Sequence, residues 1–125
     1  MQQFHSLSES EMEIMQTIWS SEPPVTTSQL LVAFAHRAWK AQTMSTFLTR
    51  LVEKGLLSVE RRGKGNAYTP AVTEREYHKR EARHVIDSMY RGSLLDFLTA
   101  FTGGAGLDPN DASALKQWFE QEVDK

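Results

Sequence analysis

Short polar side chains gather on one face of a helix that the sequence predicts near the middle of the chain. In the stretch TMSTFLTRLVEKGLL, Thr43 to Leu57, apolar residues recur at helical spacing and leave a polar face between them. Threonine is a poor choice for an exposed helical position, because its branched side chain loses freedom against the preceding turn. These side chains are better explained by binding, because their hydroxyl, amide and guanidinium groups can form hydrogen bonds with a partner. The residues proposed to do so are Gln42, Thr43, Ser45, Thr46, Thr49 and Arg50.

Positive charge is concentrated around this helix. The whole chain of 125 residues has a net charge of −2, yet positions 36–72 contain seven basic and two acidic residues. A local basic patch is what a nucleic-acid phosphate backbone requires, and the sign of the whole chain is secondary. Part of this charge lies in LLSVERRGKGNAYTP, a segment that reads as a two-stranded hairpin turning at positions 63–66. Its basic residues, expected at phosphates or in the minor groove, are Arg61, Arg62 and Lys64.

Capping signals place the helices that precede the hairpin. The Ser8–Glu11 and Thr26–Gln29 pairs have capping-box spacing and predict the starts of two helices. The third helix is expected from about Gln42 to Lys54, and positions 37–42 are either a loop or a prolongation of a neighbouring helix. Helix, helix, helix, hairpin is the order of a winged helix-turn-helix, in which the third helix enters the major groove of DNA. Positions 42–46, at the helix start, are the best placed for base contacts.

The rest of the chain, positions 73–125, is predicted to be helical. A capping box at Thr73–Glu76 opens one helix, a second covers positions 94–101, and Asp108-Pro109 opens the last. A two-helix arm has too few partners to cover its own apolar stripe, so a second copy of the chain is the simplest cover, although the stripe could form the core of one compact unit. The residues expected to dimerise are Met89, Leu94, Leu95, Leu98, Phe101, Trp118 and Phe119.

These patterns together predict a mainly α protein with a small β-hairpin. Positions 1–72 form the winged helix-turn-helix domain and positions 73–125 a C-terminal helical dimerisation region. The expected partners are double-stranded operator DNA and a second copy of the chain. The alternative is a winged-helix protein-interaction module that does not bind DNA, for which leucine or glutamate would be expected on the third helix in place of threonine and glutamine.

Several function classes find no support in the sequence. There are no cysteines, which excludes disulfides and thiolate metal sites, and His78 and His84 are spaced six apart, on different sides of a helix. No nucleophile motif or phosphate loop is present, so neither catalysis nor a cofactor or metal is expected. Neither a secretion signal nor a membrane-spanning run is present, which predicts a cytoplasmic protein without membrane insertion.

Some residues have two interpretations at this point. Arg50 could contact DNA or form an ion pair with Glu53 or with an acid of the first helix. Lys54 is expected to be solvated or near phosphate, and Tyr68 could pack on the domain or touch DNA. The polar face itself could belong to an ordinary solvated helix. Two tryptophans are expected to pack between helices rather than bind a ligand, Trp19 and Trp39.

Five segments also carry a resemblance to a known family. They are LSESEMEIMQTIW at 7–19, VTTSQL at 25–30, TMSTFLTRLVEKGLL at 43–57, GKGNAYTPAVTEREY at 63–77 and GSLLDFLTAF at 92–101. In the same order they resemble segments of the penicillinase repressor family, the BlaI/MecI/CopY group of bacterial transcriptional regulators. The resemblance implies an N-terminal winged helix, a C-terminal dimerisation arm, and repression by homodimers bound to palindromic operators.

The same resemblance bears on how DNA is released. Copper-responsive members carry paired cysteines near the C-terminus, and this chain has none. Members that respond to β-lactams are cleaved at an Asn-Phe bond after a membrane sensor-protease signals. Ala100-Phe101 occupies the matching position, with the phenylalanine kept and the asparagine replaced. The resemblance thus implies a candidate cleavage site at Ala100 and Phe101 and a membrane sensor-protease system as a further partner. The target genes and the inducing signal stay open.

Overall fold

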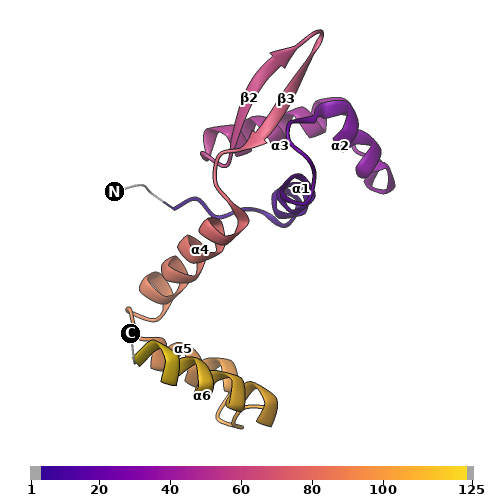
Figure 1. Cartoon of the computed structure of the whole chain (residues 1–125). Coiled ribbons are helices and arrows are strands. Elements are labelled where there is room, and N and C mark those ends of the chain that lie inside the picture. The colour runs from indigo at the N-terminus through magenta and orange to yellow at the C-terminus, as the bar shows by residue number, and fades with distance from the viewer. Residues whose placement is uncertain (1–3, 124–125) are drawn as a thin grey trace. The chain divides into compact units, whose positions relative to one another are not determined.

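The computed structural model describes residues 4–123 and is mainly helical, with one small antiparallel sheet (Figure 1). The predicted fold class is confirmed. In chain order the elements are α1 (Glu9–Trp19), β1 (Val25–Thr26), α2 (Thr27–Ala33), a short 3-10 helix η1 (Ala35–Arg37), α3 (Ala41–Glu53), β2 (Leu57–Arg62), β3 (Gly65–Pro70), α4 (Glu74–Met89), α5 (Leu94–Thr102) and α6 (Pro109–Val123).

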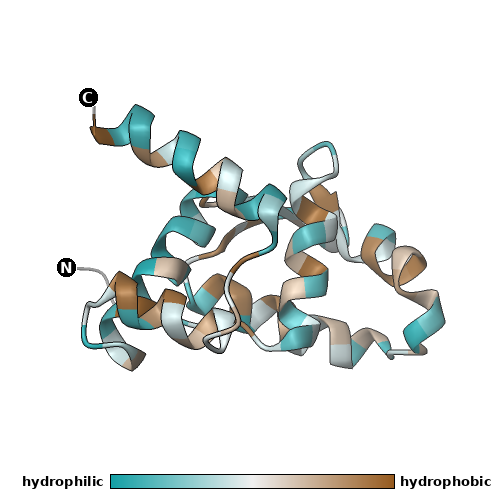
Figure 2. Cartoon of the chain, turned by 90° about the horizontal axis from the view of Figure 1, so that it is seen from below, coloured by the Kyte–Doolittle hydropathy of each residue, from teal (hydrophilic) through white to brown (hydrophobic). Residues whose placement is uncertain are grey.

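The chain divides into two compact units, positions 1–82 and 83–125, so that α4 begins in the first and ends in the second. The domain boundary expected from the sequence, between positions 72 and 73, stays a prediction. In both units, hydrophobic and hydrophilic residues alternate along the helices (Figure 2). This mixture is what amphipathic helices show when one side packs and the other meets solvent.

Two of the predicted capping boxes are present. The Ser8 hydroxyl accepts a hydrogen bond from the Glu11 amide at 3.1 Å, and the Glu11 carboxylate accepts one from the Ser8 amide at 2.8 Å. Thr26 and Gln29 exchange the same pair of bonds at 3.1 and 2.8 Å. Each box satisfies two amides at a helix start that would otherwise have no partner within the helix. These bonds fix where α1 and α2 begin.

The sheet has one strand more than the sequence predicted. β1 pairs with β3 with Val25 opposite Tyr68, and the strand order is β1-β3-β2. The sequence interpretation placed Val25 at the opening of the second helix, but the residue is buried and joins the sheet directly before the Thr26 cap. β2 and β3 pair from Leu57 opposite Pro70 to Arg62 opposite Gly65, so the turn is shorter than the predicted 63–66 and consists of Gly63 and Lys64.

The core of the first unit lies between α1, α2, α3 and the sheet. The predicted apolar stripe of α3 supplies Met44, Leu48 and Leu51, each with 0% exposure. Burying each such side chain contributes about 1.5–3 kcal/mol. Packing of this stripe therefore holds α3 against the domain and leaves its polar side at the surface. The other fully buried side chains are Ile14, Met15, Ile18 and Leu30.

The segment between α2 and α3, left open by the sequence, is a tight turn held by aromatic contacts. It consists of η1 followed by Ala38 in the left-handed conformation, with φ of 54°. The Trp39 ring stacks on Phe34 at 5.3 Å and contacts Phe47 of α3 at 5.1 Å. Trp39 thus packs between helices, as predicted, and fixes how the chain enters α3.

The first turns of α4 pack on α1 within the first unit. The indole nitrogen of Trp19 donates to the carbonyl of Val72 at 2.9 Å, and its ring lies 5.9 Å from that of Tyr77. Phe4 covers the same tyrosine at 5.8 Å. Trp19 is therefore a packing residue, in agreement with the sequence interpretation.

Candidate nucleic-acid interface

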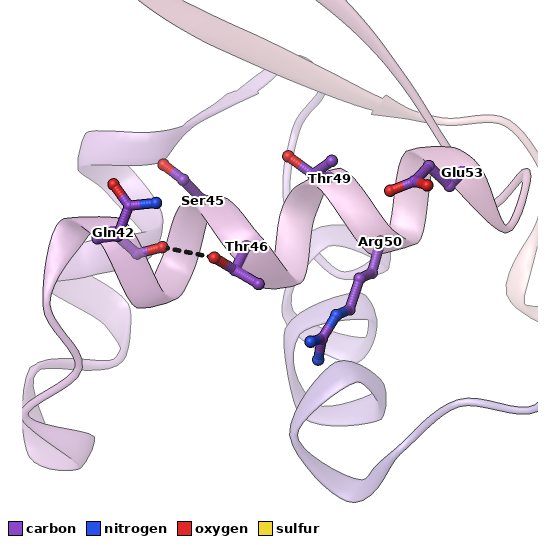
Figure 3. A pocket seen from close by; sticks show the side chains of 6 residues that line it. All are labelled: Gln42, Ser45, Thr46, Thr49, Arg50 and Glu53. Atoms are coloured by element: carbon purple, nitrogen blue, oxygen red, sulfur yellow. Dashed lines mark hydrogen bonds between the residues drawn. The ribbon is translucent and has the colours of Figure 1, made fainter.

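The polar face of α3 is exposed, and no other described element of the first unit covers it. Five of the six residues proposed on it are exposed, and Thr43 is half-buried at its edge. The side chains line a shallow depression along α3 (Figure 3). The lining residues are Gln42, Ser45, Thr46, Thr49, Arg50 and Glu53. Glu53, which was not among the residues proposed to bind a partner, also lines the depression.

Short side chains keep this face low. Serine and threonine extend two atoms beyond Cα, so the helix backbone can approach a partner closely. The hydroxyl of Thr46 donates to the carbonyl of Gln42 at 3.0 Å (Figure 3). Within residues 4–123, the hydroxyls of Ser45 and Thr49 have no hydrogen-bond partner. The face thus offers hydrogen-bonding groups that the fold itself does not use.

Arg50 belongs to this face rather than to an ion pair. Its side chain does not point towards Glu53 (Figure 3), and in the described part of the chain it forms no ion pair with Glu53 or with an acid of α1. The guanidinium is therefore available to bind a phosphate or a base edge in two-pronged geometry.

Lys54, one residue beyond α3, has a different role from the one predicted. Its ammonium group donates to the Glu11 carboxylate at 2.8 Å and to the Ser6 carbonyl at 3.0 Å. The interpretation of Lys54 as solvated or near phosphate is wrong, because a carboxylate with 3% of its side chain exposed requires a cation beside it. The contact joins the end of α3 to the start of α1.

Glu11 is the only buried charged residue among those described. Burial by itself would raise the pKa of Glu11, but hydrogen bonds from the Lys54 ammonium and from Ser8 outweigh it and hold the pKa below the usual 4.5. The sequence had identified Glu11 only through its capping box. Its partner lies 43 positions away, and no local pattern signals a pair so distant in the chain.

The β2–β3 hairpin carries the predicted basic residues at its turn. Arg61, Arg62 and Lys64 are all exposed, and the hairpin projects beyond the helices of its unit (Figure 1). Arg62 lies 3.1 Å from Glu60, but both side chains are more than half exposed. Such a pair contributes about 0–1 kcal/mol, so a phosphate can replace it at little cost. Tyr68, by contrast, is 4% exposed and packs in the core.

The residues predicted to dimerise lie at the surface of the second unit. From Arg83 to Val123, the described part of this unit contains no buried residue. Leu98 is half-buried, and the exposed members are Met89, Leu94, Leu95, Phe101, Trp118 and Phe119. Ala100 and Phe101, the candidate cleavage position, are exposed near the end of α5.

Other kinds of site receive no support. Within residues 4–123, no group of three or more histidine or acidic side chains lies close enough together to hold a metal ion. No helix in that range combines the length and the apolar character needed to cross a membrane.

Three helices followed by a projecting hairpin, with the third helix exposing a polar face, define the first unit as a winged helix-turn-helix domain. The family model for the penicillinase repressor matches residues 7–121. The chain therefore belongs to the penicillinase repressor family, and the resemblance seen in the sequence is confirmed.

Curated relatives and solved structures agree with this membership. The chain is 25% identical to the penicillinase repressor of Bacillus licheniformis over 125 residues, which covers 100% of this chain and 98% of that protein. It is 22% identical to the methicillin resistance regulatory protein MecI of Mammaliicoccus sciuri, over 90% of this chain and 91% of that one. The DNA-binding domain of the repressor BlaI superposes with a TM-score of 0.53 at 29% identity, covering 62% of this chain and 94% of that domain. The monomeric form of Bacillus licheniformis BlaI, solved in complex with the blaP half-operator, superposes with a TM-score of 0.50 at 29% identity over the same shares.

Proposed function

We propose that the chain is a sequence-specific DNA-binding transcriptional repressor that acts as a homodimer on a palindromic operator. The observation that carries the proposal is the uncovered face of α3, on which short polar side chains lie beside Arg50. The major groove of B-DNA is about 12 Å wide and admits an α-helix whose side chains are small enough to let it approach. Binding in the cytoplasm, where bacterial DNA lies, follows from this function.

Each side chain has a chemical role in the proposed complex. Gln42, in the first turn of α3, is suited to the paired donor and acceptor of adenine, and Arg50 to guanine or a phosphate. Ser45 and Thr49 can donate their free hydroxyl protons to phosphates or base acceptors. Thr43 lies at the edge of the face and would touch the backbone. The wing residues Arg61, Arg62 and Lys64 would bind phosphates beside the groove.

The relatives support this assignment. One solved relative is a repressor in complex with a half-operator, and its superposition covers 62% of this chain. The curated relatives are a penicillinase repressor and methicillin resistance regulators. Repressors are not enzymes, which agrees with the lack of a catalytic motif noted in the sequence.

The second unit supports the homodimer. Its apolar side chains are exposed in the single chain, and an exposed apolar patch of this kind marks an association surface. Two copies related by a dyad would place their α3 helices about 34 Å apart, one turn of DNA, which matches the two halves of a palindrome.

Release of DNA by proteolysis is part of the proposal by family analogy. Cleavage between Ala100 and Phe101, signalled by a membrane sensor-protease, would remove α6 and part of the dimer surface. The bond lies within the last turn of α5, so that turn would have to unwind first. Fragments that end at Ala100 in induced cells of the native host would support this route. A full-length chain throughout induction would contradict it.

A gel-shift assay separates the repressor from the protein-interaction alternative. The full-length chain is mixed with the DNA upstream of its own gene, with random DNA as competitor. A repressor gives a band that specific DNA competes away and random DNA does not. An assembly module gives no band, or one that random DNA removes equally well. The threonine, glutamine and basic side chains exposed on α3 and the wing favour the first result.

A further inference from the structure

We propose that Thr46 selects thymine in the operator through its methyl group and does not serve as a hydrogen-bond donor to a base. The inference rests on the proposed function and adds a base preference to one residue of α3. It follows from the internal hydrogen bond of this side chain, which sets Thr46 apart from the other hydroxyl residues on the same face.

The hydroxyl proton of Thr46 is already in use. It is donated to the Gln42 carbonyl at 3.0 Å, one helical turn back along α3. A hydroxyl has one proton to donate, so what remains on this oxygen is acceptor capacity. In Figure 3 the oxygen points back towards Gln42 and the methyl group points away from it. Since Thr46 is exposed, this methyl is the group that it presents to a partner.

The four bases present different hydrogen-bonding and apolar groups to this methyl and hydroxyl in the major groove. Guanine presents only acceptors, N7 and O6, and a hydroxyl that keeps its internal bond has no proton for them. Thymine presents a 5-methyl group, which gains from contact with another methyl without any proton. Adenine and cytosine present amino groups that could donate to the hydroxyl oxygen, and a pair of variants separates that case from methyl contact.

Ser45 and Thr49 provide the internal contrast. Within the described residues their hydroxyls have no partner, so both are able to donate to guanine or to a phosphate. The same helical face therefore combines two side chains that can donate with one that presents a methyl group. Such a combination can favour guanine at the positions that the donors face and thymine at the position that the methyl group faces.

The test uses the full-length chain and a duplex that it selects from a pool of random-sequence DNA. Each thymine of that duplex is replaced in turn by deoxyuridine, which lacks only the 5-methyl group. We expect one thymine per half-site at which this change weakens binding about fourfold, the loss expected for one buried methyl. With Thr46→Ser the same replacement should have no effect. With Thr46→Val, which keeps the methyl, the replacement should still weaken binding about fourfold, whatever the absolute affinity.

A matched control is Thr99→Ser, which deletes a methyl from an exposed threonine of α5 whose hydroxyl makes the same kind of internal bond, to the Leu95 carbonyl at 2.9 Å, and should leave the thymine effect at full size. Three results overturn the inference. One is a duplex in which no deoxyuridine replacement matters, and another is a thymine effect that persists in Thr46→Ser. The third is a preference for adenine or cytosine that survives in Thr46→Ser and disappears in Thr46→Val. That result would mean that the hydroxyl oxygen of Thr46 accepts a hydrogen bond from a base amino group. In all three the chain still selects a duplex, so the repressor proposal stands. A chain that selects no duplex overturns both.

Discussion

Individual residues of the first unit separate into those that hold the fold and those that the fold leaves unused. Met44, Leu48 and Leu51 are fully buried and hold α3 in place. Thr46 and Thr49, on the opposite side of the same helix, are exposed and contribute little to its stability. A helix that exposes poor helix formers on one side is best explained by what that side binds.

Acid stability is predicted to depend on Glu11. Its pKa in the folded chain is below that of the unfolded chain, because the effect of burial, which would raise it, is outweighed by hydrogen bonds from Lys54 and Ser8. The stabilisation is thus present above the unfolded value of 4.5 and is lost as the pH falls through the folded value. Denaturant unfolding of the wild type should therefore show stability falling as the pH is lowered below 4.5, and Glu11→Gln should make that fall shallower.

The matched control is Glu9→Gln, which removes an exposed carboxylate from the same turn of α1. It should leave the acid-side slope close to that of the wild type. Equal slopes for the wild type and Glu11→Gln would contradict the assignment of Glu11 as a stabilising buried carboxylate.

Some secondary-structure elements could be predicted from the sequence alone and others could not. Capping boxes are local patterns within four residues, so the starts of α1 and α2 could be predicted. The two-residue strand β1 could not, because it is defined by its pairing with β3 much later in the chain, and no alternation develops over Val25 and Thr26. The Lys54–Glu11 contact could not be predicted for the same reason, because its residues lie 43 positions apart. Interactions between distant segments depend on how the elements pack, which local spacing does not report.

The wing is predicted to supply affinity that does not depend on sequence. Replacing its three exposed basic residues together by alanine should weaken binding to all duplexes alike. The slope of log affinity against log salt should flatten by about 0.9 for each phosphate that the wing no longer neutralises. Affinity measured across a salt series for operator and random duplexes checks both points. The residues are Arg61, Arg62 and Lys64.

The control for the wing removes the same charge from exposed positions of α4 and should change the slope less. An unaltered slope in the wing variant would remove the hairpin from the interface. The control positions are Arg75, Lys79 and Arg80.

At the scale of the whole molecule, the second unit lacks a core of its own. None of its described residues is buried, and Leu95 and Phe101 are each more than 70% exposed. Helices of this kind gain their stability by packing, so a second copy is the partner that the proposed dimer provides. The sequence could identify the apolar stripe but not the partner, since the same stripe would also suit a compact core.

Dimer formation is predicted to depend on Leu98. Replacing it by aspartate places a charge within the apolar surface and should give monomers in analytical ultracentrifugation. Affinity for a palindromic duplex should fall, because two linked domains bind more tightly than one. Ser113→Asp, an exposed change on α6, should leave the dimer intact. A persistent Leu98→Asp dimer would exclude this residue from the interface.

The most direct test of the account measures how the full-length chain and its Thr46→Glu variant bind the duplex that the wild type selects. Gln16→Glu serves as control, since it makes the same change of charge at an exposed position of α1. If α3 lies in the major groove, Thr46→Glu should abolish specific binding while circular dichroism shows an intact fold, and Gln16→Glu should bind like the wild type. Normal binding by a folded Thr46→Glu variant would contradict insertion of α3 into the groove.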